Sequence, residues 1–285
     1  MKKHFLEPEI PQPREEDSRI VILPVPYDGT STWIKGADKG PAAIIDASPH
    51  LEFYDIITDS EVYQQGIHTR WADLDFSSPE NMVASVRHQV ADIIKAGRFP
   101  VVLGGEHSVT IGAAQAAAGH FHGLSFLQLD AHSDLRSKYE GSIYNHACVM
   151  ARLQELGPIV QAGIRSMDSS EKTNMDKSRV FFAHTIKQNP YWQDELISKL
   201  GDQVYVTIDL DAFDPSLLPS TGTPEPGGLF WDDVISLFQK MVKHKKVVAF
   251  DVVELCPQQE RVSDFVAAKL VYQFLSLIFS EESDS

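Results

Sequence analysis

Three side chains that can bind a metal ion alternate within residues 130–134, in the stretch DAHSD. Asp130, His132 and Asp134 are separated by the small residues Ala131 and Ser133. An extended backbone places residues i, i+2 and i+4 on one side, so the three groups share a face if the preceding strand continues. Two carboxylates that converge at a buried strand end are unfavourable unless a cation neutralises them. The stretch therefore predicts a cation-binding site.

Three further candidates lie in two other segments. His107 belongs to GGEHS (104–108), after two glycines that allow a tight turn, and Asp209 and Asp211 belong to DLD. Taken alone, His107 fits a buried, hydrogen-bonded histidine, and DLD fits a turn or a helix cap. Together the six residues supply four carboxylates and two imidazoles but no thiolate, which argues against a structural zinc site. The set suits manganese, with iron, cobalt or zinc as alternatives, and two such ions can activate water for hydrolysis.

All three segments follow apolar runs that predict strands of one sheet. Continuous apolar strands that alternate with helices indicate a parallel sheet covered on both faces, and ligands bind at the carboxyl ends of such strands. The predicted strands cover residues 19–25, 99–105, 124–130, 158–164, 204–210 and 247–255. The first predicted helix begins at Pro41 and runs through AAIIDAS. Five further helices are predicted over residues 79–97, 108–119, 146–156, 231–244 and 264–279.

The chain is long enough for one large α/β domain, and no linker or repeat divides it. We expect a catalytic domain over residues 19–280, an irregular arm over 1–18 and a frayed acidic tail over 281–285. The net charge of −15 does not favour nucleic acid and would attract a cationic small molecule, although many soluble proteins are equally acidic. No uninterrupted run of about 18 apolar residues and no signal-peptide core occurs, so we expect no membrane association. Two cysteines do not make a disulfide framework, and a cytoplasmic protein is the simplest expectation.

Four segments together resemble the ureohydrolases, the family of arginase and agmatinase. GGEHS, DAHSD, TIDLDAFDP and DVVEL occur in that family's order and spacing, and the resemblance runs from PVPYDGT to the last helix. It implies a single three-layer α/β/α sandwich with a central, mainly parallel sheet, and hydrolysis of a small cationic guanidine to an amine and urea. It also implies two Mn²⁺ per chain and a homotrimer or homohexamer. By motif, His107 and Asp134 resemble terminal ligands of one ion, Asp130 and Asp209 shared ligands, and His132 and Asp211 ligands of the other.

The resemblance assigns catalytic roles to two more residues. His146, in YNHACVM, resembles the histidine that carries a proton to the leaving amine, and an imidazole has a suitable pKa range. Glu254, in DVVEL, resembles the carboxylate that pairs with the substrate guanidinium, whose planar fork a carboxylate can accept. Asp134 is expected to orient the attacking water or to accept its proton. Outside the family, His146 fits an ordinary helix N-terminal residue and Glu254 a strand-end carboxylate facing water.

The substrate tail is indicated by weaker signals. Arginases often have Asn two places before the proton-carrying histidine and Gly after it, whereas this chain has Tyr144 and Ala147, with Asn145 between Tyr144 and the histidine. This favours agmatine, which would give putrescine and urea, and makes Tyr144 and Asn145 candidate substrate contacts. Asp168, in GIRSMD, fits either a contact to the distal ammonium or a helix N-cap.

Three alternatives remain. The loop YDGTSTW resembles enzymes of this family that act on N1-aminopropylagmatine to give spermidine, and its aromatic residues Tyr27 and Trp33 would then line a longer channel or simply pack. A deacetylase of related fold would use one zinc and an Asp-His-Asp set, but the additional ligands His107 and Asp211 argue against it. A non-catalytic metal protein is the third alternative, although the ligand positions, His146 and Glu254 are all present.

Overall fold

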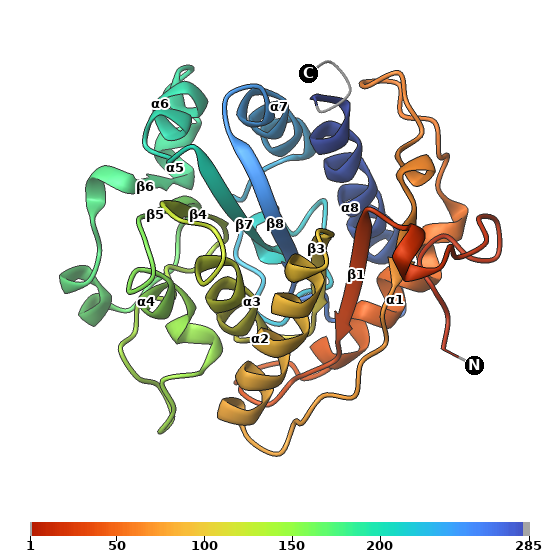
Figure 1. Cartoon of the computed structure of the whole chain (residues 1–285). Helices are drawn as coiled ribbons and strands as arrows, with labels where there is room; N and C mark the ends of the chain where they lie inside the picture. Colours follow the sequence, from red (N-terminus) through yellow and green to blue (C-terminus); the bar gives the residue numbers. More distant parts are fainter. Residues whose placement is uncertain (1, 282–285) are drawn as a thin grey trace.

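The computed structural model describes residues 2–281 and is built on one eight-stranded sheet (Figure 1). The strand order is β2-β1-β3-β8-β7-β4-β5-β6, and neighbouring strands pair in parallel throughout. The strands are β1 (Ile20–Val25), β2 (Ile67–Thr69), β3 (Phe99–Gly104), β4 (Leu124–Leu129), β5 (Ile159–Ile164), β6 (Val180–Phe182), β7 (Gln203–Asp209) and β8 (Lys246–Val253).

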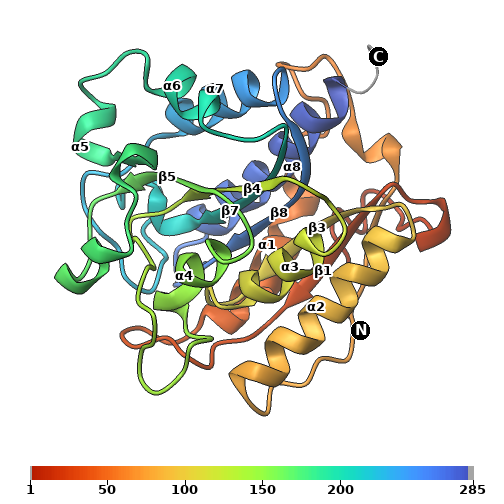
Figure 2. The same cartoon turned by 60° about the vertical axis from the view of Figure 1, so that its left-hand side comes forward.

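Helices cover both faces of this sheet. One layer contains α1 (Gly40–Ala47), α5 (Ala183–Ile186), α6 (Trp192–Ser198), α7 (Trp231–Val242) and α8 (Val262–Glu281). The other contains α2 (Pro79–Lys95), α3 (Val109–Ala118) and α4 (Val149–Leu153), and Figure 2 shows these three on the side of the sheet opposite α1 and α8. The predicted three-layer α/β/α sandwich is therefore confirmed.

The apolar strands follow from burial on both faces. In β1, Ile22 packs in the core with α1 and α8, whereas its neighbour Leu23 packs in the core with α2 and α3. In β3, Leu103 and Val102 divide between the same two cores. Because each strand needs apolar side chains on both sides, its sequence is a continuous apolar run instead of an alternating one.

Some short elements were not predicted. β2 and β6 have three residues each and lie at the two edges of the sheet, and α5 and α6 are also short. A strand of three residues offers no alternation or apolar run long enough to recognise. The helix predicted over 146–156 is instead a 3₁₀ turn, η5 (His146–Cys148), followed by the five-residue α4.

The N-terminal arm packs against the domain. Phe5 and Leu6 are buried, and their backbone N–H groups donate to Thr69 Oγ1 at 2.9 Å and to Ser48 Oγ at 2.7 Å. Further along the arm, the Glu15 carboxylate pairs with the Arg70 guanidinium. At the other end, residue 281 belongs to α8, and residues 282–285 of the predicted tail lie outside the described residues. The boundaries 1–18 and 281–285 stay predictions.

Among residues 2–281, α8 alone is long and apolar enough to cross a membrane. Of the apolar window in this helix, 78% is buried inside the molecule. Ser263, Asp264, Lys269 and Gln273 interrupt its apolar sequence, which is why it did not stand out as one uninterrupted run. Its side chains pack with α1 and α7 against the sheet, as those of a core helix do.

Candidate metal centre

The polar segments meet where four neighbouring strands end. β3, β8, β7 and β4 are adjacent in the middle of the sheet. Asp209 is the last residue of β7, Glu254 and Asp130 directly follow β8 and β4, and His107 lies three residues after β3. The carboxyl ends of parallel strands lie at one edge, so residues far apart in the sequence converge there. This is the edge at which the sequence predicted a cation site.

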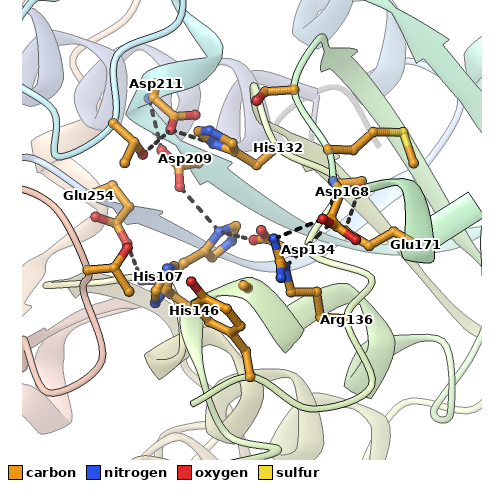
Figure 3. A pocket seen from close by; sticks show the side chains of 17 residues that line it. His107, His132, Asp134, Arg136, His146, Asp168, Glu171, Asp209, Asp211 and Glu254 are labelled. Carbon is orange, nitrogen blue, oxygen red and sulfur yellow. Dashed lines mark hydrogen bonds and ion pairs between the residues drawn. The ribbon is translucent and has the colours of Figure 1, made fainter.

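The six predicted ligands form two groups that meet at Asp130, and Figure 3 labels the other members His107, His132, Asp134, Asp209 and Asp211. In the first, His107 Nδ1 lies 3.2 Å from Asp130 Oδ2, 3.0 Å from Asp134 Oδ2 and 3.2 Å from Asp209 Oδ2. In the second, His132 Nδ1 lies 2.9 Å from Asp211 Oδ2 and 3.6 Å from Asp130 Oδ1. Asp130 therefore turns one oxygen toward each histidine, as a carboxylate shared by two ions would.

The charge distribution suits cations. His107 Nδ1 is buried and makes no hydrogen bond, although three carboxylate oxygens lie near it. Burial and the charge of Asp130 raise the pKa of Asp134 to about 7, and burial with Asp211 and Asp130 raises the pKa of Asp209 well above its usual range. Carboxylates this close do not all ionise unless positive charge is added. The residues therefore fit two divalent ions held by oxygen and imidazole donors.

A buried carboxylate fixes the orientation of His107. Its Nε2 lies 2.9 Å from Thr207 Oγ1, and the Thr207 hydroxyl donates to Asp251 Oδ1 at 2.6 Å. Because the hydroxyl proton goes to Asp251, the Thr207 oxygen accepts from Nε2–H. The Nδ1 lone pair is then available to a metal, which is the usual arrangement for a ligating histidine.

Local backbone geometry explains how DAHSD presents its side chains. Strand pairing resumes beyond β4 at His132, which forms a parallel bridge with Ser166 after a bend at Ala131, and His132 N donates to Asp130 Oδ1 at 2.6 Å. Asp134 then adopts φ 51°, in the left-handed region that residues other than glycine rarely occupy, and Glu254 does so at φ 66°. Asp209 both faces His107 and caps a 3₁₀ turn by accepting from Asp211 N at 2.9 Å, so the two interpretations of DLD hold together.

Gly105 is required by a close approach between two loops. A Cβ at this position would lie 2.0 Å from the carbonyl oxygen of Tyr27. The loops are joined there, because Glu106 N donates to Tyr27 O at 2.8 Å. Glu254 N also donates to Gly105 O at 2.8 Å, and His107 N donates to Glu254 Oε1 at 2.7 Å. The second glycine of GGEHS therefore permits contact between loops, not merely a turn.

A cavity of about 310 Å³ opens beside the two groups of ligands. His146 and Glu254 line it together with His107, Asp134 and Asp211 (Figure 3). Burial lowers the pKa of His146 to about 4, so its imidazole is neutral at pH 7. Burial and the nearby Glu106 raise the pKa of Glu254 well above its usual range, so this carboxyl group gains from a cationic partner. Both predicted catalytic residues are thus at the cavity.

Two of the predicted substrate contacts are not at the cavity. Tyr144 packs against the core formed by α2 and α3, on the far side of the loop. Asn145 is buried and caps η5 by accepting from Ala147 N at 3.0 Å. Neighbouring side chains of an extended segment point to opposite sides, and the sequence does not say which of them face the cavity. Of the two loop aromatics, Tyr27 is buried and contacts Phe76, and Trp33 is exposed.

Asp168 lines the cavity and also caps a helix. Its Oδ1 accepts from Ser170 N at 2.9 Å and from Ser170 Oγ at 2.6 Å, while Oδ2 lies 3.8 Å from Arg136 Nη2. The Arg136 guanidinium lies over the Tyr139 ring at 4.4 Å and 3.7 Å from Glu171 Oε1. Both proposed roles of Asp168 are therefore geometrically compatible, one for each oxygen.

Sequence reasoning missed several residues around the site. Arg136, Tyr139 and Glu171 line the cavity, and Arg165 donates to the backbone carbonyls of Asp211 and Glu225 at 2.7 Å each. Arg136 lies two places after Asp134, but the left-handed backbone at Asp134 ends the alternation there, so the DAHSD pattern does not extend to it. The others are common residue types whose partners are distant in sequence.

The parallel α/β/α sandwich gathers two imidazoles and four carboxylates beside a polar cavity, and this donor set could hold metal ions. The chain belongs to the arginase family, whose family model matches residues 18–276. It is 38% identical, over 96% of its length and 93% of the relative's, to the N(1)-aminopropylagmatine ureohydrolase of Synechocystis sp.. It is 39% identical to the enzyme of that name from Thermus thermophilus, over 92% of this chain and 91% of the relative.

A solved structure supports the same assignment. The agmatine ureohydrolase of Thermoplasma volcanium superposes with a TM-score of 0.89 and 31% identity, covering 100% of this chain and 96% of that one. The chain is therefore a ureohydrolase, a hydrolase that acts on linear amidines.

Proposed function

We propose that this ureohydrolase hydrolyses N1-aminopropylagmatine to spermidine and urea. The observation that carries the proposal is the Asp168 carboxylate on the cavity wall, which offers its Oδ2 to a cationic tail while the ligand groups and Glu254 receive the guanidinium end. The relatives from Synechocystis sp. and Thermus thermophilus carry the name of this activity. Agmatine becomes the second candidate, because Tyr144, whose identity favoured it, lies away from the cavity.

The tail of the proposed substrate contains an additional amine, so it needs an additional acceptor. Asp168 Oδ1 is engaged by Ser170, whereas Oδ2 has only the Arg136 guanidinium at 3.8 Å, beyond hydrogen-bonding distance. An ammonium group can therefore approach Oδ2 without breaking the helix cap.

We infer that His107, Asp130, Asp134 and Asp209 would hold one Mn²⁺ and that Asp130, His132 and Asp211 would hold a second. When bound, the two ions lower the pKa of a water molecule and so supply hydroxide at neutral pH. Glu254 orients the guanidinium through its carboxylate oxygens. Asp134, which lines the cavity beside His107, orients the attacking water or accepts its proton. His146 delivers a proton to the leaving amine.

The test is urea release from N1-aminopropylagmatine, agmatine, arginine and guanidinobutyrate, measured in parallel on the manganese-loaded protein. The proposal predicts the highest kcat/KM for N1-aminopropylagmatine. If agmatine is preferred, the substrate assignment is wrong while the ureohydrolase assignment stands. If arginine is preferred, the reasoning from the residues around His146 is also wrong.

A pair of matched variants isolates the role of Asp168. Asp168→Asn should reduce the preference for N1-aminopropylagmatine over agmatine, because the additional amine loses its carboxylate. Asp176 caps η7 (Lys177–Arg179) with the same contacts, accepting from Ser178 N at 3.0 Å and from Ser178 Oγ at 2.7 Å. Asp176→Asn therefore removes the same kind of cap elsewhere and should leave the preference unchanged. Equal effects of the two variants would assign Asp168 to capping alone.

We also propose a cytoplasmic homotrimer or homohexamer, which the family resemblance implies. Light scattering on the purified chain measures the assembly, and elemental analysis measures the manganese content, with two ions per chain expected.

A further inference from the structure

We propose that Thr30 and Glu106 are positioning residues for His146: they fix the proton of the neutral imidazole on Nδ1 and leave Nε2 to exchange a proton with the leaving amine. The inference rests on the proposed role of His146 as the group that delivers this proton. It assigns a task to the loop that contains Thr30 and to the glutamate of GGEHS, neither of which is a metal ligand.

Glu106 is fully buried behind His146 and is surrounded by donors. Its Oε2 accepts from Ser108 N at 2.8 Å. Its Oε1 accepts from Ser108 Oγ at 2.8 Å, from Thr30 Oγ1 at 2.9 Å and from Thr30 N at 3.3 Å. Backbone N–H groups can only donate, and one points at each carboxylate oxygen. This arrangement suits a carboxylate that accepts from every neighbour.

The Thr30 hydroxyl lies between Glu106 and His146 and hydrogen-bonds to both. A hydroxyl has one proton and two lone pairs. Its proton goes to Glu106 Oε1, and one lone pair accepts from the backbone N–H of His146 at 3.0 Å. The remaining neighbour is His146 Nδ1, at 3.1 Å from Thr30 Oγ1. Since the hydroxyl has no second proton to give, Nδ1 must be the donor, and the neutral ring carries its proton there.

This tautomer matters for proton delivery. With Nδ1 protonated and facing Thr30, Nε2 holds the lone pair on the opposite edge of a ring that lines the cavity. Nε2 can then accept the proton that the attacking water loses by way of Asp134, and pass it to the amine as the bond between the amine and the guanidino carbon breaks. The cation formed in between keeps both ring N–H groups, and the buried Glu106 carboxylate behind Thr30 stabilises it.

Two of the three imidazoles that line the cavity, those of His107 and His146, are held in the same way but through opposite nitrogens. His107 contacts a threonine through Nε2, which leaves Nδ1 for the metal side. His146 contacts a threonine through Nδ1, which leaves Nε2 for the substrate side. In both cases a buried carboxylate, Asp251 or Glu106, accepts the threonine proton. A single device therefore fixes one histidine for ligation and the other for proton transfer.

The folding of the loop over residues 27–36 holds Thr30 in place. Asp28 Oδ2 accepts from Gly36 N at 2.7 Å, and Asp28 Oδ1 accepts from Lys35 Nζ at 3.1 Å and from the Ser31 hydroxyl. These contacts close the loop on itself. The hydrogen bond from Glu106 N to Tyr27 O then fastens the loop to the segment that carries Glu106.

The experiment compares Thr30→Val, which removes the hydroxyl at nearly constant volume, with Thr30→Ser, which retains it. Steady-state kinetics on the manganese-loaded enzyme should show kcat about 100-fold lower for Thr30→Val, within the usual range for acid–base assistance, with KM and manganese content unchanged. Thr30→Ser should recover most of the wild-type kcat. Thr69→Val is the control, because Thr69 also accepts a backbone N–H, from Phe5 at 2.9 Å, but lies in β2. It should lower the melting temperature and leave kcat unchanged.

His146→Ala and the double variant Thr30→Val/His146→Ala complete the cycle. If Thr30 acts through His146, the double variant is no slower than His146→Ala alone. Losses that multiply, equal losses in Thr30→Val and Thr30→Ser, or a wild-type kcat in Thr30→Val would each overturn the inference. If His146→Ala itself retains the wild-type kcat, the proposed role of His146 fails first. Should Thr30→Val not fold, Thr30→Ala tests the same hydroxyl without a branched side chain.

Discussion

His107 and Asp251 are joined through a single hydroxyl group, that of Thr207. The imidazole Nε2 lies 2.9 Å from Thr207 Oγ1, which lies 2.6 Å from Asp251 Oδ1. Asp251 also accepts from the Tyr205 hydroxyl at 2.5 Å and is fully buried. A candidate metal ligand just beyond the end of β3 is thus oriented by residues of β7 and β8, so the centre of the sheet sets its direction.

The first prediction follows from this connection. Thr207→Val removes the hydroxyl that holds His107, so the affinity for Mn²⁺ should fall about 10- to 100-fold, the usual cost of losing an orienting partner. Titration of the metal-free protein measures it. Thr207→Ser retains the hydroxyl and serves as the matched control. Unchanged affinity in Thr207→Val would mean that packing alone orients the ring.

The second prediction concerns pH and metal removal. The pKa of Asp134 is raised from 3.8 to about 7 in the folded chain, and that of Asp209 is also raised, so the metal-free fold binds more protons than the unfolded chain. The stability that these protonated carboxyl groups contribute is complete below the pKa that they have in the unfolded chain. It is lost as the pH rises through the higher pKa that they have in the folded chain. The metal-free protein should therefore lose stability between these values. Metal binding requires the deprotonated ligands and should have the opposite trend.

The increase in melting temperature caused by Mn²⁺ should consequently grow from about pH 5 to about pH 8. At a free concentration near 100 times Kd, one ion contributes about 2.7 kcal/mol, or about 5–10 °C for a chain of this size. Thermal unfolding with manganese and with a chelator measures the difference. Asp134→Asn should flatten the pH dependence of the metal-free protein. An increment that shrinks with pH would contradict the assignment of these carboxylates as ligands.

The third prediction concerns Arg165, whose guanidinium lies against the carbonyls of Asp211 and Glu225 at 2.7 Å each. Arg165→Lys replaces a planar fork by one ammonium, so the free energy of unfolding should fall by about 3 kcal/mol, measured by urea denaturation. Arg179→Lys is the matched control, because the guanidinium of Arg179 donates to the single carbonyl of Lys199 at 2.7 Å. Similar losses in both variants would show that the additional carbonyl contacts of Arg165 contribute little.

The fourth prediction tests the placement of Tyr144. Because its ring packs against the core of α2 and α3, Tyr144→Phe should leave KM for every guanidine unchanged. Asn145→Ala should instead cost about 1 kcal/mol of stability, the usual cost of a lost helix cap. A raised KM in Tyr144→Phe would return this residue to the list of substrate contacts.

The sequence was sufficient for most of the sheet and for the convergence of the candidate metal ligands, for physical reasons. A strand buried on both faces must be apolar throughout, so six of the eight strands were recognisable, and DAHSD and DLD repeat every two residues where a strand ends. These signals are local. The strands β2 and β6 have three residues each and carry too few positions to show any pattern.

The residues that orient the site were not predictable, because their partners are distant in sequence. Thr30 and His146 are 116 positions apart, and His107 and Thr207 are 100 apart. Threonine and glutamate are common residue types, so their presence in a loop indicates no role until the fold brings them together. The placement of Tyr144 away from the cavity was not predictable for a related reason, because the direction of a side chain in an irregular loop follows from packing, not from spacing.

Gly105 is a residue on which the site depends but which the ligand and catalytic residues alone do not reveal. The carbonyl oxygen of Tyr27 occupies the space in which a Cβ at position 105 would lie. A single methyl group there would push apart the loops that carry Thr30 and Glu106, yet the altered gene would still encode every candidate metal ligand, His146 and Glu254. A survey that scores ureohydrolases by those residues would count the protein as an intact enzyme, so genome comparisons must include this glycine before they infer that a homologue is active.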